Sequence, residues 1–286
     1  MTATSYCRDV NAMGTRFEVF LHGDDEEHLE AVAVAVLEEV VRLDGTLSRF
    51  DPRSEIARIN REAAERSVRL DQEVFALLER CEQACHLTEG YFDVTASAGT
   101  KTVGDTPRLR LDADSRTVQF ARPEITIDLG AIGKGYALDR GREILFRYGI
   151  GCALIEGGTS SVLALDAPDK NGWLVDVRHP LTKATPLARV ALIDRGFSCS
   201  AARQPDWADQ TPSDVVNPQT GEPLAGSAAC VALAASATES EIFSTALLAM
   251  GRERAMRYLQ NHPSLDLEVG WFEPGDDFAW VKTRCE

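Results

Sequence analysis

The fold is decided by residues 127–139, which read IDLGAIGKGYALD. Apolar and polar residues alternate over 124–129, and this period of two predicts a strand. A helical pattern follows over about 136–148. Three glycines separate the two elements, and they are Gly130, Gly133 and Gly135. The stretch therefore predicts a strand, a tight glycine-rich turn and a helix.

This turn has the chemistry of an anion site. Glycine lets the backbone come close to a ligand, and the free N–H groups at the start of a helix attract negative charge. Lys134 adds a cation at the same place. The spacing fits neither a Walker A loop nor the GxGxxG fingerprint. Taken alone, the turn leaves a plain strand-to-helix connection open as the alternative.

Outward from this stretch, strands and helices alternate without a clear linker or repeat. Towards the N-terminus the pattern predicts a strand at 15–21, helices over 24–47 and 71–88, and a hairpin of 109–111 with 117–120. Towards the C-terminus it predicts helices at 240–250 and 252–261, and strands at 153–155, 162–165, 173–177, 190–193, 230–234, 267–272 and 278–281. This is an α+β pattern with antiparallel strand runs, not a repeating βαβ pattern. Residues 1–286 are expected to form a single domain, or two closely packed α/β lobes.

The composition argues against several classes of protein. The chain has 286 residues, with 45 acidic and 30 basic side chains and a formal net charge of −15. Such a charge disfavours a nucleic-acid binder, because phosphate contact needs a positive surface. No stretch approaches the roughly 18 apolar residues of a membrane span. Seven scattered cysteines, and an N-terminus without a basic and an apolar region, predict a cytoplasmic protein.

Three further segments admit both a functional and a structural interpretation. The glycine pair at 157–158 and the stretch NPQTG at 217–221 have turn compositions, and each is most simply a turn. Glu241 and Thr245 lie four residues apart, so a helix places them on one face, where their oxygens suit Mg²⁺. The alternative is an exposed glutamate that stabilises the helix dipole. None of the five histidines has metal-ligand or triad spacing.

The order of these segments is more specific than any one of them. It resembles the ApbE-type flavin transferases, the FAD:protein FMN transferase family, over about residues 11–250. The resemblance implies an ApbE-like (T-fold-like) mixed α/β architecture with largely antiparallel sheets flanked by helices. The matching segments are Met13-Gly14-Thr15, 47–60 (LSRFDPRSEIARIN), 90–95 (GYFDVT), 127–139, 156–158 (EGG), 217–221 (NPQTG) and 241–246 (EIFSTA).

The resemblance also implies a reaction. FAD is cleaved at its pyrophosphate, FMN is transferred to a Thr or Ser hydroxyl of an acceptor protein, and AMP is released. A divalent cation, Mg²⁺, is held by the carbonyl of Ala131, the carboxylate of Glu241 and the hydroxyl of Thr245. Lys134 neutralises the pyrophosphate, and Phe50 stacks on the flavin ring unless it is a core residue. The residues implied in FAD binding are Met13, Phe50, Asn60, Asp93, Gly130, Lys134, Tyr136, Asp139, Gly157 and Gly158, with Asn60 and Asp139 as positioning residues.

The sequence departs from the family pattern at three places. Asp214 stands where the family has a histidine, and an ordinary aspartate is a weak base at neutral pH. Cys199-Ser200-Ala201 replaces a T-S-G motif, and Glu241 replaces an aspartate, which lengthens the side chain by about 1.5 Å. Lys134 and Asp214 are nevertheless the expected catalytic residues, with Asp214 or water accepting the proton. Two alternatives stay open: a member that binds FAD with lost or weak transfer, and a metal-dependent FAD pyrophosphatase that yields FMN and AMP.

Overall fold

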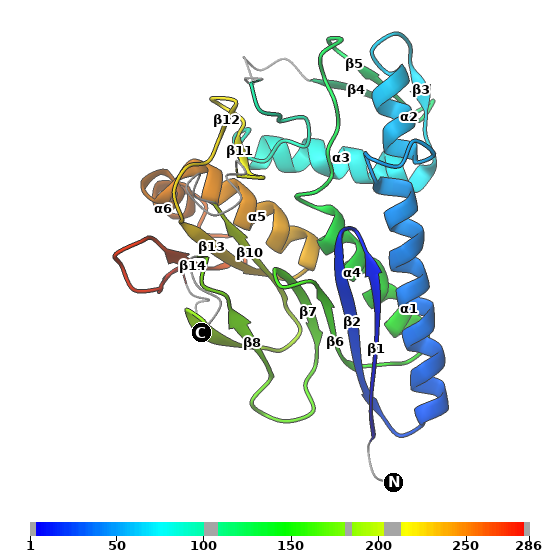
Figure 1. The fold of residues 1–286 in the computed structure, drawn as a ribbon, viewed down its shortest axis with the longest axis vertical. Helices are drawn as coiled ribbons and strands as arrows, with labels where there is room; N and C mark the ends of the chain where they lie inside the picture. Colours follow the sequence, from blue (N-terminus) through cyan, green and yellow to red (C-terminus); the bar gives the residue numbers. More distant parts are fainter. Residues whose placement is uncertain (1–3, 100–107, 181–184, 203–212, 283–286) are drawn as a thin grey trace.

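The computed structural model describes residues 4–99, 108–180, 185–202 and 213–282 (Figure 1). It has the expected α+β architecture, in which helices pack on a large antiparallel sheet. Residues 1–3 of the N-terminal segment discussed above lie outside the described part. Within the described part, no helix is long and apolar enough to cross a bilayer.

A sheet of eight strands forms the centre of the molecule. Its strand order is β1-β2-β6-β7-β10-β13-β14-β15, and every neighbouring pair is antiparallel. All five residues of β7 are buried, because both faces of the sheet are covered there. The strands are β1 (Thr4–Ala12), β2 (Thr15–Gly23), β6 (Cys152–Gly157), β7 (Ser161–Leu165), β10 (Gly196–Ala201), β13 (Ala229–Ala234), β14 (Glu268–Phe272) and β15 (Ala279–Lys282).

Three helices cover one face of this sheet. α1 contacts β1 and β2, α4 contacts β6 and β7, and α5 contacts β10 and β13. α4 touches both α1 and α5, so the three form one layer (Figure 1). The helices are α1 (Glu26–Leu47), α2 (Glu55–Glu62), α3 (Gln72–Leu87), α4 (Gly133–Arg147), α5 (Ala237–Met250) and α6 (Arg252–Asn261).

The helix starts differ in a way that matters for the site. α1, α2, α3 and α5 begin after Asp or Ser residues whose side chains accept a backbone N–H of the first turn. α4 begins after Ile132, which makes no such side-chain bond. The N–H of Gly133, the first residue of α4, donates instead to the Leu129 carbonyl at 2.8 Å.

The smaller strands surround the large sheet. The hairpin of β8 (Trp173–Val177) and β9 (Ala188–Leu192) packs apolar side chains such as Val177 and Leu192 against Phe197 and Val231 on the second face. The predicted hairpin near residue 115 is present as β4 (Leu109–Asp112) and β5 (Thr117–Phe120), joined by β3 (Val68–Arg69). β11 (Val216–Asn217) pairs with β12 (Glu222–Pro223).

The strand predicted over 124–129 is wrong. Ile125, Ile127 and Leu129 are buried as the alternation required, but the segment joins no sheet in the described part of the chain. The side chain of Asn60 on α2 takes the place of a neighbouring strand. Its Oδ1 accepts the N–H of Ile127 at 2.7 Å, and its Nδ2 donates to the Ile127 carbonyl at 2.9 Å. The next residue, Asp128, donates its N–H to the Val94 carbonyl at 2.8 Å. The segment that leads into the glycine-rich turn is thus held by the Asn60 amide and by one backbone bond.

Asn60→Ala should lower the free energy of unfolding by about 2 kcal/mol, because it leaves a buried N–H and a buried carbonyl of Ile127 without partners. Urea denaturation measures the change. Asn261→Ala, at the exposed end of α6, is the matched control and should stay within about 0.5 kcal/mol. A wild-type midpoint for Asn60→Ala would contradict this bracing role.

Candidate active site

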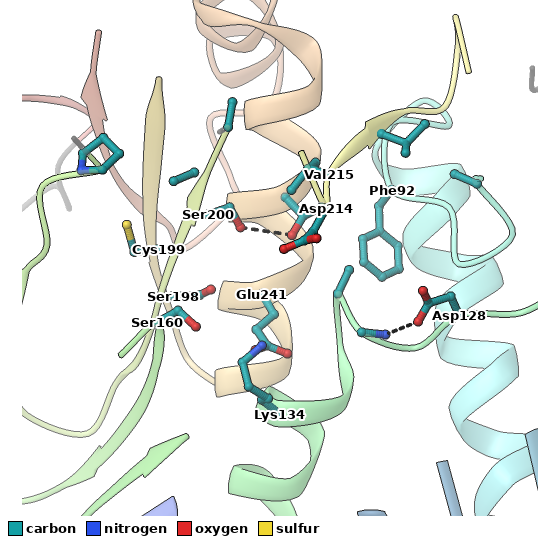
Figure 2. A pocket seen from close by; sticks show the side chains of 18 of the residues that line it. Phe92, Asp128, Lys134, Ser160, Ser198, Cys199, Ser200, Asp214, Val215 and Glu241 are labelled. Carbon is teal, nitrogen blue, oxygen red and sulfur yellow. Dashed lines mark hydrogen bonds and ion pairs between the residues drawn. The ribbon is translucent and has the colours of Figure 1, made fainter. Parts of the chain in front are cut away.

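A cavity of about 640 Å³ opens where the start of α4, the body of α5 and the end of β10 meet. Loop segments that lie far apart in the sequence complete its wall, at 91–96, 128–131, 178–180 and 214–218. Figure 2 shows Lys134 on α4 reaching up to Glu241 on α5, with the serines of β10 beside them. The glycine-rich turn and the Glu241–Thr245 helix face therefore share one cavity.

The two helices approach each other closely at Gly135. A Cβ atom on this residue would lie 2.5 Å from the carbonyl oxygen of Ala237, so only glycine fits. The N–H of Gly135 donates to Oε2 of Glu241 at 2.7 Å. Gly135 lies in the first turn of α4, where the backbone N–H groups have no acceptor within the helix. The first regular bond of the helix runs from the Tyr136 N–H to the Ile132 carbonyl.

Glu241 is 3 % exposed, so the interpretation as an exposed helix-start glutamate is wrong. Three donors surround its carboxylate. Besides Gly135, the hydroxyl of Ser161 donates to Oε1 at 2.5 Å, and Nζ of Lys134 lies 3.3 Å from the same oxygen. Burial of a carboxylate costs free energy unless such partners compensate for the lost water. These contacts join β7, α4 and α5 at one point.

The oxygen atoms at this point fit a Mg²⁺ ion. Glu241 supplies a carboxylate, Thr245 lies one turn further along the same face, and Ala131, just before the start of α4, lines the same cavity. Among the described residues, no group of three or more His, Cys, Asp or Glu side chains is placed to hold a metal ion. A metal ion at this point would therefore also need neutral oxygen ligands. Mg²⁺ is commonly bound by one or two carboxylates together with the phosphates of a substrate. The donor set agrees with that pattern.

Hydroxyl groups on β10 and α5 form a short network beside Thr245. Ser200 Oγ lies 2.9 Å from Ser244 Oγ and 3.1 Å from Thr245 Oγ1. Ser244 also donates to Ser198 at 3.0 Å. The serine of the altered T-S-G motif therefore orients the Thr245 hydroxyl. Burial raises the pKa of the neighbouring Cys199 thiol to about 12.

The side chains that line the cavity include both cations and carboxylates. The described lining residues include two full cations, Lys134 and Arg178, and four carboxylates, which belong to Asp93, Asp128, Asp214 and Glu241. A diphosphate would add further negative charge. Two of these carboxylates are already paired with cations outside the lining, Asp93 with Arg108 and Asp128 with Arg49. A bound divalent cation would offset the charge of the diphosphate.

The structure brings together seven of the residues that the sequence singled out. They are the cavity-lining residues Asp93, Gly130, Ala131, Lys134, Asp214, Glu241 and Thr245. Asp93 is also tied into the wall, since its Oδ1 accepts from the hydroxyl of Thr95 at 2.6 Å and its Oδ2 lies 3.6 Å from Nε of Arg108. Its contact with a ligand stays a prediction.

The remaining predicted residues do not line this cavity, and they are Met13, Phe50, Asn60, Tyr136, Asp139, Gly157 and Gly158. Asn60 and Asp139 bind backbone groups of the segments that carry the cavity wall. The hydroxyl of Tyr136 donates to Glu73 at 3.3 Å. Met13 occupies the β1–β2 turn with a φ of 49°. Gly157 and Gly158 lie in the β6–β7 hairpin, whose turn residues Thr159 and Ser160 reach the cavity instead.

Phe50 is 80 % exposed, so the interpretation as a core residue is wrong. The guanidinium of Arg49 lies 4.5 Å from the centre of its ring. The same guanidinium forms an ion pair with Asp128, which lines the cavity, at 3.1 Å. Phe50 is thus linked to the edge of the cavity through Arg49, and its stacking on a flavin stays a prediction.

Sequence reasoning missed the segment Arg178-His179-Pro180. It follows the predicted strand at 173–177 and brings a cation and an imidazole to the cavity. The His179 ring packs edge-on against Phe272 of β14, with ring centres 4.8 Å apart. An Arg-His pair at the end of a strand was the available signal, but no spacing rule connects it to the glycine-rich turn.

Known proteins share both the sequence pattern and the fold. The family model described as the ApbE family matches residues 13–268. The chain is 23 % identical to an FAD:protein FMN transferase of Klebsiella pneumoniae over 287 aligned positions, which cover 90 % of this chain and 82 % of the relative. It is 26 % identical to one of Treponema pallidum, covering 81 % and 76 %.

Solved structures show the same fold. The ApbE protein of Thermotoga maritima superposes with a TM-score of 0.83 at 22 % identity, covering 97 % of each chain. The flavin transferase ApbE of Vibrio cholerae superposes with a TM-score of 0.80 at 19 % identity, covering 98 % of this chain and 97 % of the other. Because the family model spans most of the sequence and these folds coincide over nearly all of it, the chain belongs to the ApbE family.

Proposed function

We propose that this protein is a transferase that moves FMN from FAD to a Thr or Ser hydroxyl of an acceptor protein and releases AMP, with Mg²⁺ as its cofactor. Membership of a family whose curated relatives are named FAD:protein FMN transferases supports this activity. The observation that carries the proposal is the shared cavity, in which the glycine-rich turn and Lys134 face Glu241 and Thr245.

The side chains suit transfer at a diphosphate. Lys134 and Arg178 supply positive charge to the pyrophosphate, and the N–H groups at the uncapped start of α4 add a favourable dipole. The acceptor oxygen attacks the phosphorus on the FMN side, and the bond from this phosphorus to the bridging oxygen breaks. The AMP phosphate leaves with that oxygen, and Asp214 or water accepts the hydroxyl proton.

Ala131, Glu241 and Thr245 would hold the Mg²⁺ ion. When bound, the ion supplies positive charge that stabilises the phosphate oxygens during in-line transfer. The other residues do the positioning: Ser200 orients the Thr245 hydroxyl, while Ser161 and Gly135 orient the Glu241 carboxylate.

We also propose that this activity takes place in the cytoplasm. The proposal is based on the free thiol state of the cysteines. Six of the seven lie in the described part of the chain, and all six are free thiols there. Free thiols are typical of a reducing compartment.

The test uses the purified chain, FAD and an acceptor protein that ApbE relatives flavinylate, with and without Mg²⁺. We expect AMP release and acceptor fluorescence on a denaturing gel only with Mg²⁺. Lys134→Ala and Thr245→Ala should each reduce both signals at least about a hundredfold, because each removes an interaction with the developing charge. Lys170→Ala, at an exposed loop lysine, is the matched control and should be unaffected.

The alternatives give different products. Free FMN and AMP without acceptor would favour a pyrophosphatase, for which the aspartate at position 214 is the supporting observation. Bound FAD without any AMP would favour a binding protein that has lost transfer.

A further inference from the structure

Lys134 forms an ion pair with the carboxylate of Glu241, the group that would bind the metal ion. Its Nζ is 3.3 Å from Oε1 of Glu241, and its side chain is only 23 % exposed. It is the only lysine among the described residues that line the cavity. In the described part of the chain, this ammonium group forms an ion pair with Glu241 when no ligand is bound.

A divalent cation on Glu241 would compete with this contact. Oε1 already accepts from Ser161 and faces Lys134, while Oε2 accepts from Gly135. An ammonium and a divalent cation on one buried carboxylate repel each other strongly, because water screens charges poorly at such a site. One of the two cations must move away or bind weakly.

The structure allows Lys134 to move without disturbing the carboxylate. Lysine has a flexible four-carbon stem, and the ammonium is the most exposed partner of Glu241. Ser161 is fully buried on β7, and the Gly135 N–H belongs to the backbone of α4. These two fixed donors keep the carboxylate oriented when the ammonium leaves.

We propose that Lys134 makes divalent-cation binding depend on the substrate diphosphate. In the nucleotide-free protein, Lys134 neutralises Glu241 and keeps the affinity for a divalent cation low. A diphosphate gives the ammonium a new acceptor, which frees Glu241 for the cation. The two ligands therefore bind with positive coupling, and each raises the affinity for the other by the same factor. This inference rests on the proposed function, because it takes the diphosphate of FAD as the second ligand.

The first measurement needs neither FAD nor an acceptor. Mn²⁺ alone is titrated into the full chain, and free Mn²⁺ is followed by electron paramagnetic resonance. Lys134→Met should bind Mn²⁺ at least tenfold more tightly than the wild type, whereas Lys134→Arg, which keeps the charge, should stay weak. Lys170→Met is the matched control and should match the wild type. Glu241→Gln in the Lys134→Met background should abolish the gain, which shows that the ion binds at this carboxylate.

The second measurement follows FAD by its fluorescence in the presence of a chelator. Lys134→Met should bind FAD at least tenfold more weakly than the wild type. Mn²⁺ affinity in Lys134→Met equal to or below that of the wild type would overturn the proposal, as would a gain that survives Glu241→Gln. If neither protein binds FAD, the proposed function fails, while the Mn²⁺ titration still decides whether Lys134 and the cation compete.

Discussion

Glu241→Gln should lower the rate of AMP release from FAD by about a thousandfold, the range seen when a single electrostatic contact to a transition state is lost. The change keeps the shape of the side chain but removes its negative charge. A neutral amide is a poor ligand for Mg²⁺. In the wild type, one carboxylate oxygen accepts from Ser161 and the other accepts from the Gly135 N–H. Glutamine has only one accepting oxygen, so one of these two hydrogen bonds is lost. The half-buried ammonium of Lys134 also loses its counter-charge. The initial rate of AMP formation at saturating Mg²⁺ measures the effect.

Two further substitutions separate charge from stability. Glu239 lies on the same helix but outside the cavity lining. The control variant Glu239→Gln should therefore keep the wild-type rate of AMP release. Glu241→Asp keeps the charge with a shorter arm, as in the family pattern, and should retain more than about a tenth of the rate. Thermal unfolding shows whether each variant is folded. A folded Glu241→Gln protein with more than a tenth of the wild-type rate would contradict the role of this carboxylate.

Asp139→Ala should lower the free energy of unfolding by about 3–5 kcal/mol, the range for removing one partner of a buried charged network. Asp139 is 7 % exposed on α4 and binds the start of α5. Its Oδ1 accepts the N–H of Ala237 at 3.0 Å, and its Oδ2 accepts the N–H and the hydroxyl of Thr238 at 3.1 and 2.5 Å. Alanine leaves all three donors buried and unpaired, and it removes a negative charge from the positive end of the α5 dipole.

Denaturation in urea measures this loss. Asp139→Asn should lose less stability, because the amide keeps one accepting oxygen at the same place. Asp114→Ala, in the exposed β4–β5 turn, is the surface control and should change the free energy by at most about 0.5 kcal/mol. A loss below about 1 kcal/mol for Asp139→Ala would show that α5 is positioned by other contacts.

Helices with a strong hydrophobic periodicity could be predicted from the sequence. The helix at 252–261 has the predicted bounds, and the helices near 24–47 and 71–88 differ by one or two residues at their ends. These segments carry their own periodicity and, at α1 and α3, aspartate caps. Strand alternation was less reliable. The same pattern at 124–129 marks a segment with buried apolar residues that pairs with no strand. Its N–H groups at Ile127 and Asp128 are accepted by the Asn60 side chain and the Val94 carbonyl. Alternation predicts which residues are buried, but it does not predict which groups accept the N–H groups.

The candidate site was predictable as a set of segments, and their arrangement was not. Residues 127–139 and 241–246, read in order with the other matching segments, identify the family and point to Lys134, Glu241 and Thr245. The contact of Lys134 with Glu241 joins residues far apart in the chain, and the Ser161 hydroxyl reaches Glu241 across 80 residues. No local pattern encodes such a pair.

By itself, the sequence determined five of the six described helices, all except α2, together with most of the strands, the family and the residue types that meet at the site. Periodicity, turn composition and ordered motifs are local properties of the chain. The tertiary structure alone decided that Glu241 is buried, that Lys134 lies on it, that Asn60 and Asp139 brace the wall, and that Phe50 is exposed. Burial and charge pairing depend on which distant elements pack together, and that packing exists only once the sheet and its helix layer have formed.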